Sequence, residues 1–253
     1  MEQDNIKLFS IENKYLLGFL KPMKDLIIDF RINLNQYGFN ICEISPDNVS
    51  LMDINIKKEL LGYFNIDYIK QENPILCFNS DSFYKLLKDF KKEDITFYIN
   101  TEKTKIFLSF SNGFNSEIDL INMEESQKSL IGLNLNFDIS LNMDSIKFKE
   151  IIKQYKKISE SVKFELNKEG FFINSSNNLF KSGFKCENIE VLKNENPLNK
   201  SFYALEFLNK FIVTDISEKV KISFSNDYPL KLNYINQYWD ICFILSPRIE
   251  GEN

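Results

Sequence analysis

Two stretches of the chain carry the same order of apolar and polar positions. In residues 16–44, and again in residues 148–176, apolar residues first recur every three or four positions and then every second position. The first spacing is typical of an amphipathic helix and the second of a β-strand. The stretches align without a gap, and Gly38 and Gly170 fall at the same place. Each copy therefore predicts a helix, a strand, a tight turn at the glycine and a second strand.

Each copy is followed by a second, more weakly related unit, whose match needs a short insertion. A helical stripe comes first and two alternating runs follow. These segments are 83–90, 95–99 and 106–110 in the first half, and 205–212, 220–224 and 230–234 in the second. The chain thus predicts two copies of one domain, each with two helices packed on largely antiparallel sheets, which is an α+β fold.

The segment between the copies is polar and acidic and has no clear period, so we interpret it as an interdomain connector. We place the N-terminal domain at residues 1–119, the connector at 120–136 and the C-terminal domain at 137–253.

One residue disagrees with the helical pattern. Pro22 has no backbone N–H, and it predicts that the first helix ends or kinks in its C-terminal third.

The basic residues of the chain are almost all lysine. The net charge is −5, and only Arg31 and Arg248 among 31 basic residues are arginine. That charge alone disfavours a nucleic acid partner, but lysines gather opposite the apolar stripes of the predicted helices. One such helix would be an ordinary solvated face; three related helices favour non-specific contact with the backbone of duplex DNA. The predicted contacts are Lys14, Lys21, Lys24, Lys85, Lys88, Lys92, Lys149, Lys153, Lys156, Lys157 and Lys210.

Most enzymatic chemistry is disfavoured by what the sequence lacks. There is no histidine, the commonest general base and metal ligand. The four cysteines are far apart and are interpreted as buried, reduced thiols. No phosphate-binding or nucleophile motif is present. We therefore predict no catalytic residue, no metal and no cofactor.

The absence of a long apolar run and of a signal peptide predicts an intracellular protein without membrane contact.

Several short motifs, taken in order, resemble those of the proliferating cell nuclear antigen family of DNA sliding clamps. They are GFNI at 38–41, DNVSL at 47–51, KLLK at 85–88, YPLKL at 228–232 and LSPRIE at 245–250. The resemblance covers essentially the whole chain, and its most specific part is the C-terminus. No one motif is decisive, but their order and spacing identify the chain as a clamp.

The resemblance implies a homotrimeric ring whose channel is lined by the lysine-bearing helices. Edge strands near 105–110 with 115–120, and near 178–186, are expected to pair between subunits. The implied partners are duplex DNA, a DNA polymerase, other replication and repair proteins with a clamp-binding peptide, and a clamp loader. The expected place of action is the nucleus or, for a viral protein, the site of viral DNA replication.

The resemblance also implies a pocket for the hydrophobic plug of a partner peptide. The matching positions are Ile44, Val49, Leu51, Met123, Leu130, Ile131, Pro229, Ile244, Ser246, Pro247 and Ile249. The sequence departs from the family at Asn48, where histidine is common, and at Ile244, where tyrosine is common. The connector also lacks the family pattern. This divergence favours a large DNA virus or an AT-rich protist as the source.

Three alternatives remain open at this point. The same fold can act as a monomeric or dimeric processivity factor, or as one subunit of a heterotrimeric checkpoint-type clamp. A metal-dependent nuclease would need carboxylates such as Glu124 and Glu125, which lack supporting ligands nearby. A protein-binding scaffold without a DNA role is the third.

Overall fold

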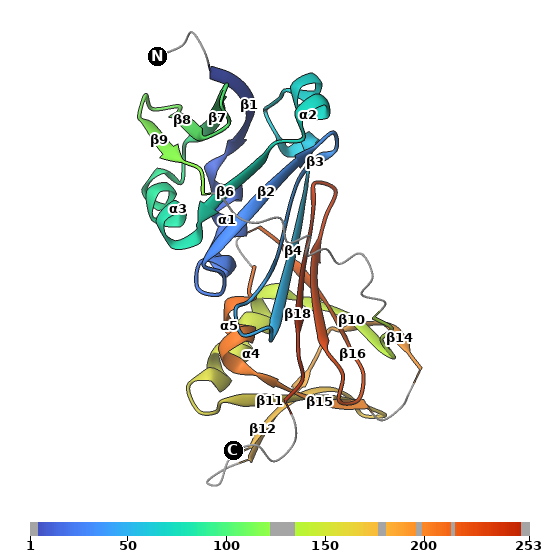
Figure 1. The fold of residues 1–253 in the computed structure, drawn as a ribbon. Helices are drawn as coiled ribbons and strands as arrows, with labels where there is room; N and C mark the ends of the chain where they lie inside the picture. Colours follow the sequence, from blue (N-terminus) through green and yellow to red (C-terminus); the bar gives the residue numbers. More distant parts are fainter. Residues whose placement is uncertain (1–4, 122–134, 177–180, 196–198, 214–215, 249–253) are drawn as a thin grey trace. The chain divides into compact units, whose positions relative to one another are not determined.

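The computed structural model describes residues 5–121, 135–176, 181–195, 199–213 and 216–248 (Figure 1). They form helices and mostly antiparallel sheets, which confirms the predicted α+β class. The chain divides into two compact units. Unit 1 comprises residues 1–46, 53–130 and 237–240, and unit 2 comprises 47–52, 131–236 and 241–253. Among the helices described, none is long and apolar enough to cross a membrane.

The first half of the chain, up to residue 119, contains nine strands, three α-helices and two 3-10 helices. They are β1 (Asn5–Glu12), α1 (Asn13–Met23), β2 (Asp29–Asn35), β3 (Gly38–Ile44), β4 (Ser50–Lys57), η1 (Lys58–Leu60), β5 (Tyr63–Phe64), α2 (Ile66–Glu72), β6 (Ile75–Asn79), α3 (Ser80–Leu87), η2 (Lys88–Phe90), β7 (Asp94–Asn100), β8 (Lys105–Phe110) and β9 (Asn115–Asp119). One sheet has the order β5-β1-β7-β8-β9, and β4, β3, β2 and β6 are neighbours in another.

The second half repeats this order in the residues that the structure describes. Its elements are β10 (Ile139–Asp144), α4 (Ser145–Lys156), β11 (Ser161–Asn167), β12 (Gly170–Ser176), β13 (Lys181–Cys186), β14 (Glu190–Asn194), β15 (Asn199–Ala204), α5 (Leu205–Lys210), β16 (Lys219–Phe224), β17 (Leu230–Ile235) and β18 (Trp239–Leu245). One sheet has the order β13-β12-β11-β15, and β14, β10, β16, β17 and β18 follow one another in another.

The repeat predicted from the apolar pattern is visible in matching details of the backbone. Gly38 and Gly170 both adopt positive φ, 140° and 134°, at the start of the second strand of their hairpins. At Gly38 a Cβ atom would lie 1.9 Å from the carbonyl oxygen of Ile56, so only glycine fits there. The amides of Asn13 and Ser145, which begin α1 and α4, donate at 2.9 and 2.8 Å to carbonyls just before β7 and β16.

The buried face of each predicted helix is the one that the sequence indicates. In unit 1, α1 and α3 lie side by side, and Phe83 of α3 stacks on Phe78 at 4.3 Å. In unit 2, α4 lies beside α5, and the ring of its buried Phe148 meets Phe164 edge-on. Burial of these apolar faces leaves the lysine-bearing faces of the helices toward solvent.

Three local features differ from the prediction or extend it. The structure adds α2, a short helix that buries only Ile69 and is capped by the side chain of Asn65. Helix α5 ends at Lys210, so Ile212 lies outside it. Pro22 is accommodated in the last turn of α1, which ends one residue later. Pro22 lacks its own N–H donor, but because the helix ends one residue later, almost no helix follows the distortion that the proline causes.

Candidate nucleic-acid interface

The predicted lysines of unit 1 lie on the exposed side of α1 and along the segment from α3 to residue 92. Lys14 and Lys21 belong to α1, and Lys24 is its C-terminal capping residue. Lys85 belongs to α3, whereas Lys88 begins η2. The remaining lysine, Lys92, follows η2 and lies outside the predicted helical stripe 83–90. All of them except Lys24, which is half-buried, are exposed.

Carboxylates already neutralise several of the unit 1 lysines. Lys14 forms a close ion pair with Glu12, and the hydrogen bond that it donates raises the pKa of its ammonium group. Lys24 lies 2.6 Å from the carboxylate of Asp25. Lys85 lies 2.5 Å from Asp81, one helical turn earlier. A phosphate group that approaches these lysines therefore competes with a carboxylate.

The lysines of unit 2 are concentrated at the C-terminal end of α4. Lys153 and Lys156 are in the last turn, and Lys157 caps the helix. All three are exposed, and no carboxylate of the described residues lies within ion-pair distance of them. Lys149 is on the same helix and partly exposed. Positive charge at this helix end is also favoured by the helix dipole.

Helix α5 contributes little positive charge. Lys210 is half-buried, and its ammonium group lies 5.5 Å from the centre of the Phe207 ring. Glu206 in the first turn balances its charge. The positive charge on the helices of unit 2 therefore lies mainly on α4 and not on α5.

Two further exposed lysines on these segments were not predicted as contacts. Lys91 caps η2, and Lys147 lies in the first turns of α4, 3.7 Å from Glu150. The prediction kept only lysines opposite an apolar stripe. It therefore left out Lys91, which stands next to Lys92 in the sequence, and Lys147, which lies three residues before Glu150.

The described part of the predicted peptide pocket is built around the C-terminal tail in unit 2. The Ser246 N–H donates to the Val49 carbonyl at 3.0 Å, and the Arg248 N–H donates to Phe202 at 2.8 Å. These two bonds hold Pro247 between them. Asn48, beside Val49, adopts a φ of 58°, a left-handed conformation that asparagine tolerates well. The tail and the loop before β4 are thus fixed against each other within unit 2.

The predicted pocket residues differ in how far they reach the surface. Val49, Pro229, Ile244 and Pro247 are partly exposed, and Ser246 is exposed. Leu51 is only 7% exposed and belongs to the core. Ile44 lies in unit 1 and is partly exposed. Four predicted positions lie outside the described residues: Met123, Leu130, Ile131 and Ile249.

Six described strands end a sheet, and two of them lie near the segments expected at subunit contacts. They are β9 in the sheet β5-β1-β7-β8-β9 and β13 in the sheet β13-β12-β11-β15. No side chain of β9 is buried, and in β13 only Cys186 is. Strands with open N–H and C=O groups on one side readily pair with another chain. These edges coincide with the segments that the sequence predicts at subunit contacts.

Comparison with known proteins identifies the lineage of this fold. Residues 133–248 match the family described as proliferating cell nuclear antigen, C-terminal domain. The chain is 24% identical over 230 residues to a DNA polymerase sliding clamp of Archaeoglobus fulgidus, covering 90% of this chain and 92% of the relative. It is 26% identical over 243 residues to proliferating cell nuclear antigen of Chaetomium thermophilum, at the same coverage.

Solved structures agree with the sequence relatives. A structure of A. fulgidus PCNA with the C-terminal region of FEN-1 bound superposes with a TM-score of 0.83 at 21% identity, over 99% of this chain and 100% of the other. The chain is thus similar, over about nine-tenths of its length, to archaeal sliding clamps and to proliferating cell nuclear antigen (PCNA). PCNA of Entamoeba histolytica gives the same TM-score at 17% identity, covering 98% of this chain and 100% of the other. The sequence identity between this chain and these PCNA structures is thus low, although the clamp fold is kept throughout.

Among the residues that the structure describes, no group of three or more His, Cys, Asp or Glu side chains is arranged to hold a metal ion. The four cysteines are all buried, and no disulfide joins them. Burial raises the pKa of the Cys186 thiol to about 12, which keeps it protonated and unreactive. The carboxylates Glu124 and Glu125, considered above for a nuclease, lie outside the described residues.

Proposed function

We propose that this chain is a DNA sliding clamp, a ring of three copies that encircles duplex DNA and keeps a DNA polymerase on it. The observation that carries the proposal is a set of exposed helix lysines in a chain with net charge −5. They sit on a fold that known clamps match over nearly the whole chain. Lysine contacts with phosphates are not base-specific, so they suit a protein that moves along any sequence.

The chemistry required of such a protein is binding without a reaction. A closed ring stays on DNA by topology, so weak, salt-sensitive lysine–phosphate contacts suffice and permit sliding. We therefore assign no catalytic residue, metal or cofactor to the chain. The DNA contacts in this proposal are the eleven predicted lysines, and those at the end of α4 are among the least neutralised by carboxylates.

Partner proteins would dock through a short peptide beside the C-terminal tail. In unit 2, the partly exposed Val49, Pro229, Ile244 and Pro247 supply apolar surface, and Ser246 supplies a polar rim. The FEN-1 peptide bound to the A. fulgidus relative is a precedent for such docking. We extend the partners to a DNA polymerase, repair proteins and a clamp loader. Action would be intracellular, where DNA is replicated.

The proposed domains are those expected from the sequence, 1–119 and 137–253, joined by a connector over 120–136. The family match over 133–248 supports the C-terminal domain. In a ring, β9 of one copy would pair with β13 of the next, since both are sheet edges. A head-to-tail contact of this kind closes into a ring when its rotation permits.

Light scattering over a concentration series tests the assembly. The monomer mass is 29.9 kDa, so a closed trimer should hold at about 90 kDa. A mass of one or two chains at every concentration would replace the ring by a monomeric or dimeric processivity factor, or by one subunit of a heterotrimer.

Retention on DNA tests the function itself. Linear duplex is attached to beads by one end, the protein threads on, and the free end is then blocked with streptavidin. At 1 M salt, where charges are screened beyond about 3 Å, a topologically linked ring should remain until a restriction enzyme opens the duplex. Equal loss from blocked and open DNA would refute encirclement and favour a scaffold without a DNA role.

A further inference from the structure

A polar pocket lies on the sheet β13-β12-β11-β15, on the face that looks away from the core. Lys163, Asn174 and Gly183 stand in one row across β11, β12 and β13. Val162 and Phe164, which flank Lys163 in β11, point to the opposite face of the sheet and are buried. The pocket has a volume of about 420 Å³ and is also lined by Ser161, Ser175, Lys181, Ser182 and Phe202.

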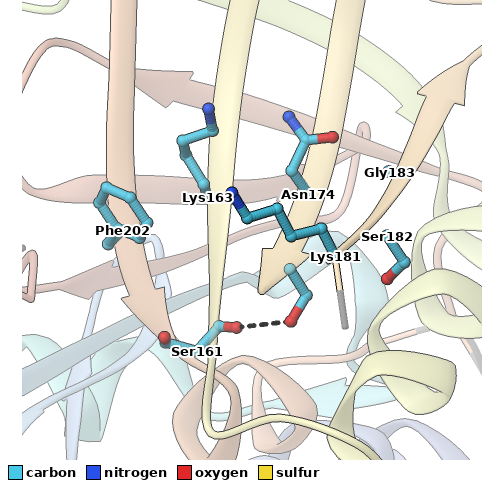
Figure 2. A pocket seen from close by; sticks show the side chains of 8 residues that line it. Ser161, Lys163, Asn174, Lys181, Ser182, Gly183 and Phe202 are labelled. Carbon is cyan, nitrogen blue, oxygen red and sulfur yellow. Dashed lines mark hydrogen bonds between the residues drawn. The ribbon is translucent and has the colours of Figure 1, made fainter. Parts of the chain in front are cut away.

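The missing side chain of Gly183 helps to open this pocket. A Cβ atom there would lie 2.5 Å from the Asn174 side-chain oxygen, so the glycine leaves room for that amide. Figure 2 shows Lys181 reaching from β13 toward Lys163, with Asn174 beside it. The depression therefore adjoins β13, the edge strand of its sheet, rather than the middle of the domain.

The pocket carries an excess of positive charge. Lys163 is paired at 2.5 Å with Glu165, which lies outside the pocket lining. Lys181 has no carboxylate within ion-pair distance among the described residues. No described residue of the lining is acidic. Two ammonium groups and one carboxylate leave a net charge of about +1, suited to a single carboxylate rather than to a polyanion such as DNA.

Strand β9, the sheet edge proposed above to pair with β13 of another copy, carries the complementary charge. On β9, Glu117 and Asp119 alternate with Ser116 and Ile118, so both acids project to the same side. Lys105 of β8 is the only described cation paired with them: it forms a close ion pair with Glu117 and lies 3.6 Å from Asp119. One ammonium group for two carboxylates leaves a net charge of about −1 on this face.

We propose that the pocket of one copy receives a carboxylate of the acidic face of β9, Glu117 or Asp119, from the next copy. This inference rests on the ring proposed above and names the side chains that select its contact. The occupant is a second copy of this chain because the acidic strand is itself an unpaired edge, as β13 is. The contact orients each copy head to tail, since two β13 edges would bring lysines together.

A double-mutant cycle tests the pairing by sedimentation equilibrium. The pocket variant is Lys163→Gln with Lys181→Gln, and the strand variant is Glu117→Gln with Asp119→Asn. A charge-matched control is Lys168→Gln with Lys219→Gln, two exposed lysines of unit 2 that lie neither in the pocket lining nor on β13. Circular dichroism first verifies that each variant folds.

Each neutralised face should raise the monomer–trimer midpoint concentration about tenfold, because a ring contains the contact three times. The combination of both variants should cost no more than either alone, and the control should stay within about twofold. If the wild-type protein is a trimer and the pocket variant has the same midpoint concentration, this pairing is overturned and the ring remains. The same result is expected if an acidic partner peptide fills the pocket. Losses that multiply in the combined variant would overturn it as well. A wild-type protein that is monomeric throughout would refute the ring and this inference together.

Discussion

The lysines at the end of α4 should supply much of the electrostatic contact with DNA. Lys153, Lys156 and Lys157 are exposed, and among the described residues they have no carboxylate partner. We consider a variant in which all three become glutamine. Glutamine keeps a similar length and helix propensity, so the change removes charge and little else.

The size of the effect follows from counterion release. Each phosphate contact contributes about 0.9 to the slope of log affinity against log salt, so three lost contacts make the slope shallower by about 2.7 for each contacting protomer. Over a fourfold rise in salt, the ratio between wild-type and variant affinities should therefore shrink about 40-fold. The assay is fluorescence anisotropy of a labelled duplex, titrated with protein at several salt concentrations.

The matched control removes three lysines that carboxylates already neutralise, Lys14, Lys24 and Lys85. Its slope should change less, because a lysine whose charge a neighbouring carboxylate cancels adds little net positive charge at a phosphate and so releases fewer of the cations condensed on the DNA. An unchanged slope in the α4 variant, or an equal change in both variants, would refute the reasoning from exposed and unpaired charge.

Three further predictions concern single groups. Asn13→Ala should lower the free energy of unfolding by about 2–3 kcal/mol in urea titrations. The reason is that two backbone carbonyls, at the end of α3 and of η2, lose the amide group that donates to them at 2.8 and 2.9 Å. A loss smaller than that of Ser145→Ala, which removes one such bond, would contradict this prediction. The Cys186 thiol should resist iodoacetamide at pH 8 in the folded protein and react in urea, since burial holds its pKa near 12; rapid labelling of the folded protein would show the thiol accessible. Hydrogen bonding from Lys163 lowers the pKa of Glu165, so its stabilisation, up to about 1 kcal/mol, is present above the ordinary glutamate pKa and lost as the pH falls through the lowered value. Lys163→Gln should thus destabilise the protein at pH 7 and progressively less as the pH falls below the ordinary glutamate pKa, and a loss that does not change with pH would contradict the assignment.

The sequence by itself determines the repeated architecture of this protein. The apolar spacing in 16–44 and 148–176 predicts a helix and a hairpin in each half, and the structure contains them as α1, β2 and β3, and as α4, β11 and β12. Gly38 and Gly170 adopt the positive φ that the turn requires. These features are local: a helix face, a strand face and a glycine turn each depend on residues a few positions apart. The lysine-rich faces follow from the same periodicity.

Only the tertiary structure decides which of the predicted groups are available. The sequence does not distinguish Leu51, a core residue, from the partly exposed Val49 two positions earlier. It places Lys24 and Lys153 alike, although only Lys24 meets a carboxylate at 2.6 Å. The pocket beside Gly183 forms because Lys163, Asn174 and that glycine become neighbours across three strands. Strand pairing and side-chain partners depend on contacts between residues far apart in sequence, and the periodicity of a single segment carries no information about its neighbours.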